Sequence, residues 1–491
     1  MKYMGIDLGT SSMKLLLMDE KGAIVNTVTK EYPLEFPHPG WSQQNPADWE
    51  KALLEGVPEL LKGFDPREVA GIGCGGQMHG LVVLDKEDSV IRPAILWNDG
   101  RTAAQTEYLN TQIGKDKLSQ WTANIAFAGF TAPKILWMRE QEPENFARIA
   151  KIMLPKDYIN YILTGVHACD YSDASGTLLL DVEHKCWSKE MLEVCGISQG
   201  QLPRLFESYE CIGTLKPAMA ARLGLLPQVK VAAGAGDNAA AAVGTGTVGE
   251  GGCTLSLGTS GTVFISSKTF GVDKHNALHA FAHADGGWHL MGCMLSAASC
   301  NRWFCEDILC TEDFFAEQAQ IREEKLGENH VFFLPYLMGE RSPINDTNAR
   351  GTLIGMTMDT SRADLVQAVL EGVAFALRDS VEAARDLGIV IPACKLCGGG
   401  AKSPLWRRIM ANVLNMRLEL PLSEQGPGMG GAMLSMVACG AYETVQDCCH
   451  ALVSAAAVVE PEPALAAKYE KRYRQFKNIY PACRNLFPEL L

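Results

Sequence analysis

The sequence predicts an α/β protein that contains the same fold twice, once in each half of the chain. The first observation is the length, because 491 residues exceed what one hydrophobic core usually organises and indicate two or three domains. The second is a pattern of strand, Gly-Thr-Ser turn and strand that occurs near residue 9 and again near residue 258. The third is a helical pattern that follows the strands of the first copy.

The N-terminal segment supplies the first copy of this pattern. Residues 3–8, 13–18 and 23–29 have the composition of strands, and tight turns separate them. Residues 46–62 have helical spacing, with a proline near the first turn. This opening differs from the strand–turn–helix opening of Rossmann and P-loop domains, and the chain has no Gly-x-x-x-x-Gly-Lys-Ser/Thr motif. The sequence therefore argues against both of these nucleotide-binding classes.

The second copy begins just past the middle of the chain. Residues 252–257 and 262–266 predict strands on either side of a turn at 258–261. We place the domain boundary in the glycine-rich segment before them, which gives domains of residues 1–246 and 247–491. Gly-Thr-Ser turns also occur in unrelated proteins, so the repeat by itself leaves a chance similarity open. Near the C-terminal end of the sequence, Tyr469, Tyr473, Phe476 and Tyr480 recur at i, i+4, i+7 and i+11, which predicts one helix that packs its aromatic face on the body of the protein.

The overall charge limits the partners. The net charge is −13, whereas nucleic acids and anionic membranes require a basic face. A metal ion and backbone dipoles can offset the charge of a nucleotide, so ATP remains compatible. Asp7 stands where a secretory signal would need an apolar core, and no apolar run reaches the roughly 20 residues of a membrane span. We therefore expect a cytoplasmic protein without nucleic-acid or membrane partners.

Glycine-rich turns predict a nucleotide site. The Gly-x-Gly-x-x-Gly run at 244–249 follows a predicted helix, whereas a dinucleotide fingerprint must follow a strand, so we interpret it as a boundary loop. The turns at 9–12 and 258–261 fit phosphate binding better, because glycine admits close approach and the hydroxyls and amides donate hydrogen bonds. A third cluster at 398–401 offers bare backbone for an adenine or a ribose.

Two carboxylates are candidates for the chemistry. Phosphoryl transfer needs positioning, charge stabilisation and often a carboxylate that accepts the hydroxyl proton. We assign that role to Asp237, which the sequence places at the N-terminal end of a helix, where the dipole favours the ionised form. A plain helix cap is the alternative for this residue. Asp7 precedes the first turn and is placed to hold hydrated Mg²⁺.

Polar loops at 75–80 and 97–101 could bind a sugar, because each offers donors and acceptors on a glycine-flanked bend. His275, His279 and His283 have the spacing of metal ligands on a helix. Their context alternates like a strand, however, and on a strand they would not converge. We therefore set metal binding by these histidines aside.

Several long segments resemble the FGGY family of carbohydrate kinases. Residues 4–11 are similar to the opening hairpin of that family, residues 129–138 to its first signature and residues 351–371 to its second. Gln77-Met78-His79-Gly80, together with residues 95–101, is similar to the family members that act on xylulose. Glycerol-specific members carry an Arg-Glu pair at the position of Met78-His79. The resemblance covers nearly the whole chain.

The resemblance implies two ribonuclease-H-like domains of the actin and hexokinase type, with the active site in the cleft between them. It implies transfer of the γ-phosphate of ATP to D-xylulose with Mg²⁺ as cofactor, Asp237 as the catalytic base and Asp7 as the magnesium ligand through water. The expected sugar contacts are Gln77, Met78, His79, Asp237 and Asn238. The expected nucleotide contacts are Thr10, Ser11, Ser12, Gly258, Thr259, Gly399 and Gly400.

Some alternatives remain open at this point. Another ketopentose or a polyol could be the acceptor, and a nucleotide-binding sensor without kinase activity could share the fold. Ser403-Pro404 stands where some family members have an asparagine near the adenine, which puts that base contact in doubt. A homodimer is an expectation from family habit.

Overall fold

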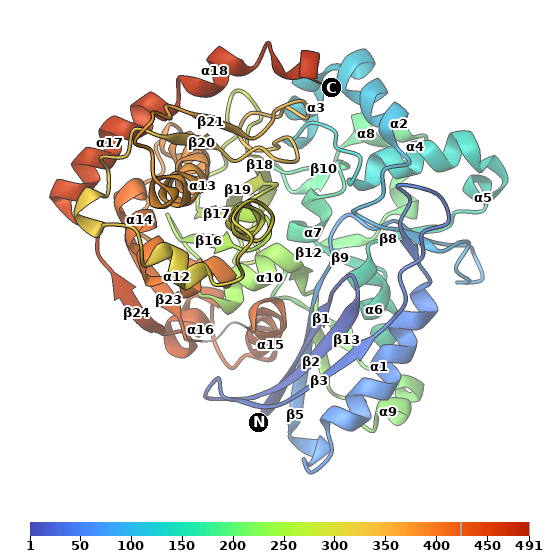
Figure 1. Ribbon diagram of the computed structural model, residues 1–491. Helices are drawn as coiled ribbons and strands as arrows, with labels where there is room; N and C mark the ends of the chain where they lie inside the picture. Colours follow the sequence, from blue (N-terminus) through green and yellow to red (C-terminus); the bar gives the residue numbers. More distant parts are fainter. Residues whose placement is uncertain (423–424, 491) are drawn as a thin grey trace.

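The computed structural model describes residues 1–422 and 425–490 and has two lobes, each built around a twisted sheet (Figure 1). The first sheet has seven strands in the order β13-β14-β5-β1-β2-β3, with β15 also pairing with β5. Its strands are β1 (Lys2–Leu8), β2 (Ser12–Asp19), β3 (Ile24–Glu31), β5 (Val69–Gly76), β13 (Cys211–Thr214), β14 (Lys230–Ala232) and β15 (Ala235–Gly236).

The second sheet also has seven strands, in the order β18-β19-β17-β16-β22-β23-β24. They are β16 (Cys253–Leu257), β17 (Gly261–Ser267), β18 (His279–Ala282), β19 (Trp288–Met294), β22 (Ala393–Cys397), β23 (Arg417–Pro421) and β24 (Ala455–Val459). Five short two-stranded pairs complete the strands of the described residues: β4 (Gln43–Gln44) with β7 (Ala94–Ile95), β6 (Val82–Leu84) with β8 (Lys151–Met153), β9 (Ala168–Asp170) with β12 (Arg204–Phe206), β10 (Leu180–Asp181) with β11 (Cys186–Trp187), and β20 (Phe332–Leu334) with β21 (Thr352–Ile354).

The two sheets share one connectivity. In the first, β1 pairs antiparallel with β2 and parallel with β5, while β2 continues antiparallel to β3 and β5 parallel to β14. In the second, β16 pairs antiparallel with β17 and parallel with β22, while β17 continues antiparallel to β19 and β22 parallel to β23. The repeated Gly-Thr-Ser hairpin is therefore the start of a repeated sheet, which confirms the predicted duplication.

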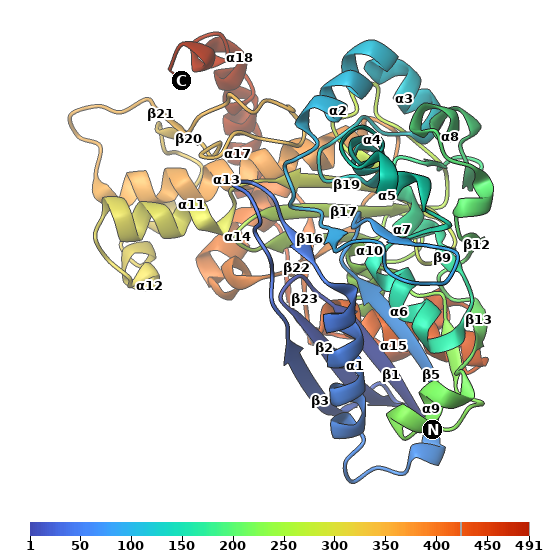
Figure 2. The ribbon, with the colours of Figure 1, turned by 90° about the vertical axis from the view of Figure 1, so that its right-hand side faces the viewer.

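Helices cover both sheets (Figures 1 and 2). In the first half they are α1 (Pro46–Leu60), α2 (Ala103–Tyr108), α3 (Lys115–Thr122), α4 (Thr131–Gln141), α5 (Pro143–Ala147), α6 (Pro155–Thr164), α7 (Tyr171–Ser175), α8 (Lys189–Cys195), α9 (Pro217–Leu223) and α10 (Asp237–Gly244). In the second half they are α11 (Ala298–Trp303), α12 (Phe314–Gln318), α13 (Arg362–Arg385), α14 (Pro404–Leu414), α15 (Gly426–Cys439), α16 (Val445–Leu452), α17 (Pro463–Phe476) and α18 (Ile479–Cys483).

The predicted elements are confirmed with shifts of one or two residues at their ends, but the C-terminal aromatic stripe is not one helix. Tyr469, Tyr473 and Phe476 are buried on α17, as predicted. Tyr480 lies on the separate helix α18, because α17 ends at Phe476 and a turn intervenes. Its hydroxyl donates a hydrogen bond to Asp346 Oδ2 at 2.8 Å.

One helix crosses between the halves. Although α15 belongs to the second half of the sequence, it packs on the first sheet beside β1 and β5 (Figure 2). The contact is backbone to backbone, since a β-carbon on Gly5 would lie 1.9 Å from the carbonyl oxygen of Gly428, and one on Gly73 would lie 2.0 Å from that of Gly431. The predicted boundary between residues 246 and 247 lies between α10 and β16 and stays a prediction.

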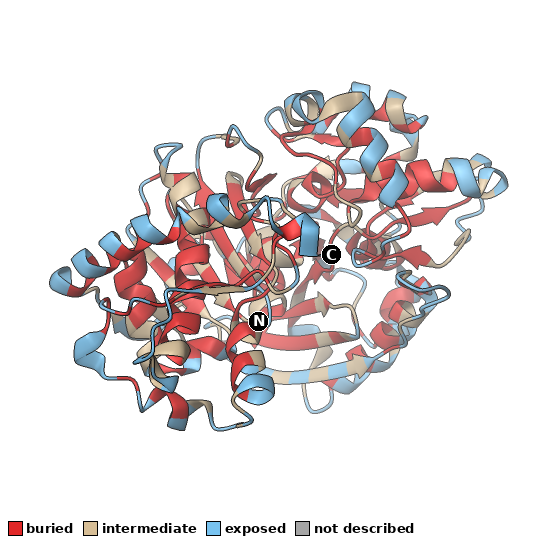
Figure 3. Cartoon of the chain, turned by 45° about the horizontal axis from the view of Figure 1, so that its top comes forward, coloured by how far each residue is buried: buried red, intermediate tan, exposed pale blue. Residues whose placement is uncertain are grey.

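Buried residues concentrate in the two sheets and in the helix faces against them (Figure 3). Helix α13 is an example, since every residue from Val366 to Leu377 is buried. Ser361 caps the N-terminal end of this helix in a capping box with Asp364. Among the described residues, no helix combines the length and the apolar character required to cross a membrane.

Candidate active site

Three strand ends of the first sheet bring the predicted catalytic and sugar residues together. β1 and β15 both pair parallel with β5, so Asp7 and Ala235 flank Gly75 in one row of the sheet. The carboxyl ends of parallel strands meet at one sheet edge, which is where open α/β sheets bind ligands. Gln77 and Asp237 follow directly after two of these strands.

Asp237 is the first residue of α10, and Gly236 occupies the cap position. The alternative of a plain cap therefore does not describe it. Asp237 Oδ1 accepts hydrogen bonds from the backbone N–H of Asn238 at 2.7 Å and from Asn238 Nδ2 at 3.0 Å, while Oδ2 has no hydrogen-bond partner among the described residues. Burial raises the pKa of Asp237 to about 7, and the negative charge of Asp7 adds to this. Such a carboxylate can exchange a proton near neutral pH.

Asp7 has an environment suited to a hard cation. Its carboxylate makes no hydrogen bond to the described protein, and burial raises its pKa to about 6, while Lys14 acts in the opposite direction. A divalent cation would relieve the mutual repulsion of Asp7 and Asp237. The described residues contain no group of three or more His, Cys, Asp or Glu side chains arranged to hold a metal ion. Mg²⁺ usually keeps several waters and takes one or two carboxylates plus phosphate oxygens, so the single carboxylate of Asp7 is a suitable ligand for it.

Met78 lies directly against the start of α10. Its side chain is buried, and a β-carbon on Gly236 would approach it at 2.9 Å. Asn238 Nδ2 points at Met78 Sδ, at a distance of 3.8 Å. The structure therefore brings together three of the predicted sugar-binding residues, Met78, Asn238 and Asp237.

His79 adopts a left-handed backbone conformation, with φ of +68°. Its Nδ1 lies 2.6 Å from the carbonyl oxygen of Gly176, which can only accept, so Nδ1 carries the proton and Nε2 is a hydrogen-bond acceptor. Burial lowers the pKa of His79 to about 3, so the ring is neutral. The ring stacks on Phe130 with a centroid distance of 4.7 Å and lies 6.4 Å from Phe281 of the second half.

Gln77 faces the first hairpin turn. Its backbone N–H donates to the carbonyl of Leu8 at 2.8 Å, and its Nε2 donates to Gln44 Oε1 at 3.1 Å and to the carbonyl of Gly9 at 3.4 Å. Its Oε1 is buried and has no hydrogen-bond partner within the part of the chain that the structure describes. Gln77 thus ties the end of β5 to the Gly9 turn, and its role as a sugar contact stays a prediction.

The predicted nucleotide residues of the second half line one cavity of about 530 Å³. It contains Gly258 and Thr259 from the second hairpin and Gly399 and Gly400 from the third glycine cluster. No local pattern indicated its other main walls, because the aromatic residues Phe314, Phe315 and Trp406 and the amide of Gln318 come from distant elements. Ser403 is used internally, because its hydroxyl contacts Gln318 Oε1 at 2.5 Å and caps α14 at Trp406.

Thr10, Ser11 and Ser12 lie on the first hairpin and do not line this cavity. Thr10 Oγ1 accepts a hydrogen bond from Trp97 Nε1 at 3.0 Å. A second cavity of about 310 Å³ separates α10 from the second sheet and runs from Asn238 to Gly398. It supplies the expected cleft between the halves, while phosphate binding by Thr10–Ser12 stays a prediction.

The polar loop at 97–101 offers fewer groups for ligand binding than its composition indicates. Asp99 and Arg101 form a fully buried ion pair at 2.8 Å, and the guanidinium of Arg101 lies 4.0 Å from the ring of Trp41. Both charged groups are therefore engaged inside the protein and are not exposed to a ligand. Sequence reasoning missed Phe130 and Phe281, which contribute rings around His79, because apolar residues in predicted elements resemble ordinary core.

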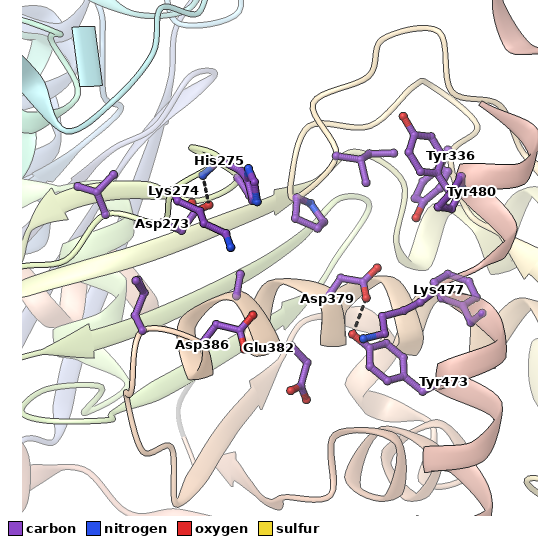
Figure 4. A pocket seen from close by; sticks show the side chains of 18 residues that line it. Asp273, Lys274, His275, Tyr336, Asp379, Glu382, Asp386, Tyr473, Lys477 and Tyr480 are labelled. Atoms are coloured by element: carbon purple, nitrogen blue, oxygen red, sulfur yellow. Dashed lines mark hydrogen bonds between the residues drawn. The ribbon is translucent and has the colours of Figure 1, made fainter. Parts of the chain in front are cut away.

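A larger cavity, of about 750 Å³, lies elsewhere (Figure 4). α13 supplies Asp379 and Glu382, Asp386 caps the end of that helix, and the C-terminal helices supply Tyr473 and Tyr480. None of the residues predicted to bind sugar, nucleotide or metal lines it. Size alone therefore does not locate the candidate active site, which rests on the strand ends and on the glycine turns.

Comparison with protein families covers most of the chain. Residues 2–244 match the N-terminal domain of the FGGY family of carbohydrate kinases, and residues 253–439 match its C-terminal domain. The chain belongs to the FGGY family of carbohydrate kinases. Its membership confirms the resemblance found in the sequence and the predicted enzyme class, a sugar kinase.

Similar curated proteins include the xylulose kinase of Bacillus subtilis (strain 168), which is 38% identical over 99% of this chain and 98% of the relative. The xylulose kinase of Escherichia coli (strain K12) is 39% identical over 97% of this chain and 98% of the relative. The crystal structure of a xyloylose kinase from Brucella ovis superposes with a TM-score of 0.93 at 41% identity, covering 99% of this chain and 100% of the other. The predicted actin- and hexokinase-type fold is confirmed by such FGGY neighbours.

Proposed function

We propose that this protein transfers the γ-phosphate of ATP to D-xylulose and forms D-xylulose 5-phosphate. The observation that carries the proposal is the contact between Met78 and Asn238, which sets the xylulose-type loop directly beside the base candidate Asp237. Curated xylulose kinases at 38% and 39% identity over nearly the whole chain support the same substrate.

The first half of the chain supplies the sugar site, and the second half supplies the adenosine site. D-Xylulose binds at the strand ends of the first sheet, where Met78, His79, Asn238 and Asp237 surround it. The adenosine part of ATP occupies the cavity lined by Gly258, Thr259, Gly399 and Gly400, with Thr10, Ser11 and Ser12 on the phosphate side. Gln77 holds the Gly9 turn against this site.

Asp237 accepts the proton of the primary C5 hydroxyl as its oxygen attacks the γ-phosphorus in line. The oxygen forms a bond to phosphorus, the bond to the β-phosphate oxygen breaks, and ADP leaves. Asn238 orients the carboxylate through two hydrogen bonds to Oδ1, which leaves Oδ2 for the hydroxyl. Mg²⁺, held by Asp7 through water, would neutralise phosphate charge when bound. Burial of the site limits water as a competing acceptor.

A second acceptor class remains a candidate because the fold does not separate substrates. The gluconate kinase and the ligand-bound xylulose kinase of Lactobacillus acidophilus both superpose with a TM-score of 0.94 at 26% identity. The choice of xylulose therefore rests on the local residues and on the full-length relatives.

The test is ADP release by the purified protein with Mg-ATP and a panel of D-xylulose, L-ribulose, L-xylulose, glycerol, D-fructose and D-gluconate. A maximum on D-xylulose that Asp237→Ala lowers by about 10²–10⁴, the usual range for loss of a general base, supports substrate and mechanism. A maximum on another compound removes the substrate assignment and keeps the kinase. Near-normal turnover of Asp237→Ala removes Asp237 from its role.

Two further expectations belong to this proposal. A cytoplasmic location agrees with a substrate and a cosubstrate that are found inside the cell. A homodimer is proposed from the family, and sedimentation equilibrium of the purified protein tests it directly.

A further inference from the structure

His79 has an unusual backbone for its residue type. A non-glycine residue in the left-handed region carries strain on the order of 1 kcal/mol, and it persists only where its surroundings determine the conformation. The ring of His79 is fixed by its hydrogen bond to the carbonyl of Gly176 and by stacking on Phe130. The remaining question is what holds the backbone.

The carbonyl oxygen of His79 accepts two side-chain hydrogen bonds, and both donors come from the start of α4. Lys134 Nζ donates to it at 2.8 Å, and Thr131 Oγ1 donates at 3.1 Å. Lys134 Nζ also donates to the carbonyl of Gly129 at 2.6 Å. Gly129 in turn contacts the Trp97 loop so closely that a β-carbon on it would lie 2.5 Å from the carbonyl oxygen of Trp97.

Lys134 is placed where a lysine is otherwise unfavourable. Its side chain is fully buried, and in residues 1–422 and 425–490 no acidic side chain lies within ion-pair distance of Nζ. Burial of an unpaired amine is costly, so an apolar residue would serve packing better at this position. Burial also lowers the pKa of Lys134 well below its ordinary value, and the charge of Asp99 opposes this. Either protonation state can donate to both carbonyls.

We propose that Lys134 is a positioning residue for the sugar: it clamps the His79 turn to the Gly129 loop and so aims the acceptor Nε2 of His79 at a sugar hydroxyl. Nε2 has no hydrogen-bond partner in the described protein, so it is available to a hydroxyl donor. The partners of Lys134 Nζ are the carbonyls of His79 and Gly129, so Lys134 contacts neither the proposed nucleotide site nor the base candidate Asp237. The sugar side of the site depends on it, and the nucleotide cavity, built from the second half, does not.

This inference rests on the proposed function for its kinetic test. Lys134→Met keeps the length and apolar stem of the side chain and removes the donor. Lys134→Met raises KM for the sugar by about tenfold or more and leaves KM for ATP within about twofold.

Thr131→Val removes the weaker donor at the same carbonyl and gives a smaller rise in KM for the sugar. This second variant tests the proposal if Lys134→Met does not fold. Lys395→Met is the matched control, because Lys395 also donates to a backbone carbonyl, that of Gly246, away from His79.

The tautomer of His79 gives a readout that needs no turnover. In ¹⁵N-labelled protein the ring nitrogens of His79, assigned by their loss in His79→Gln, show a protonated Nδ1 and an unprotonated Nε2. In Lys134→Met this signature shifts toward a mixture of tautomers, whereas in Lys395→Met it is unchanged.

If the wild type shows no sugar-dependent ADP release, the proposed function fails and the tautomer experiment still decides this inference. A folded Lys134→Met protein with wild-type sugar KM and an unaltered His79 signature overturns it, as does a loss shared equally by sugar and ATP.

Discussion

Asp7 and Asp237 lie near the carboxyl ends of two strands that flank the same strand, β5, from opposite sides: Asp7 pairs with Gly75, and Asp237 directly follows Gly236, which pairs with Gly76. The charge of Asp7 disfavours ionisation of Asp237, and burial raises the pKa of both groups, that of Asp237 to about 7 and that of Asp7 to about 6. The arrangement puts the proposed proton acceptor and the proposed cation ligand on either side of one glycine-rich strand end.

The first prediction concerns this pair. Burial and Asp7 raise the pKa of Asp237, so Asp7→Asn removes one of the two causes and lowers that pKa. The carboxyl carbon of Asp237, assigned with Asp237→Asn in ¹³C-labelled metal-free protein, titrates near pH 7 in the wild type and at lower pH in Asp7→Asn. An unchanged midpoint in Asp7→Asn would mean that the two charges do not interact.

The second prediction concerns the nucleotide cavity. A β-carbon on Gly399 meets no atom within 4 Å, and the residue lines the cavity assigned to adenosine. Gly399→Val therefore leaves the fold intact but fills space that the nucleotide needs, and it raises KM for ATP by about tenfold or more with little change in KM for the sugar. Steady-state kinetics with each substrate varied in turn measures this. A wild-type KM for ATP would place the nucleotide elsewhere.

The third prediction concerns the contact between α15 and the first sheet. A β-carbon on Gly73 would lie 2.0 Å from the carbonyl oxygen of Gly431, and neither backbone can move away freely. We expect Gly73→Ala to lower the free energy of unfolding by about 3 kcal/mol, at the upper end for overpacking. Gly200→Ala is the control, because its nearest neighbour is 3.9 Å away, and it stays within about 0.5 kcal/mol. Urea unfolding of both variants decides whether the packing is as close as described.

The fourth prediction concerns pH and stability at the large cavity of Figure 4, where Tyr473 donates a hydrogen bond to Asp379 Oδ1 at 2.5 Å. Burial raises the pKa of Asp379 to about 7, above the value of about 3.9 in an unfolded chain. The folded state therefore holds the proton more tightly, so the stability from this group is complete below about pH 4 and is lost as pH rises through 7.

Asp379→Asn removes that dependence. Relative to the wild type, the variant gains up to about 1 kcal/mol per pH unit between pH 5 and 7. Urea midpoints of both proteins at half-unit steps of pH measure the difference, in which the other titrating groups cancel. Parallel curves for the two proteins would show that Asp379 is ionised throughout.

Much of the active site could be predicted from local sequence. The turns at 9–12 and 258–261 and the start of α10 follow from short-range rules, because glycine, hydroxyl residues and helix ends determine their own backbone. The prediction that Tyr480 continues α17 was wrong, because periodicity alone does not show where a helix stops; Pro481, which disfavours helical backbone at Tyr480, was the local signal against one continuous helix.

The sequence by itself determined the repeated fold and the family, and it singled out Asp237 as the proposed base, since these depend on residue type and spacing along the chain. Only the tertiary structure decided which residues meet. It joined Met78 to Asn238, turned Gln77 toward the Gly9 turn and placed Lys134 against the carbonyl of His79. These contacts link residues far apart in sequence, and their geometry follows from how sheets and helices pack, which short-range patterns do not encode.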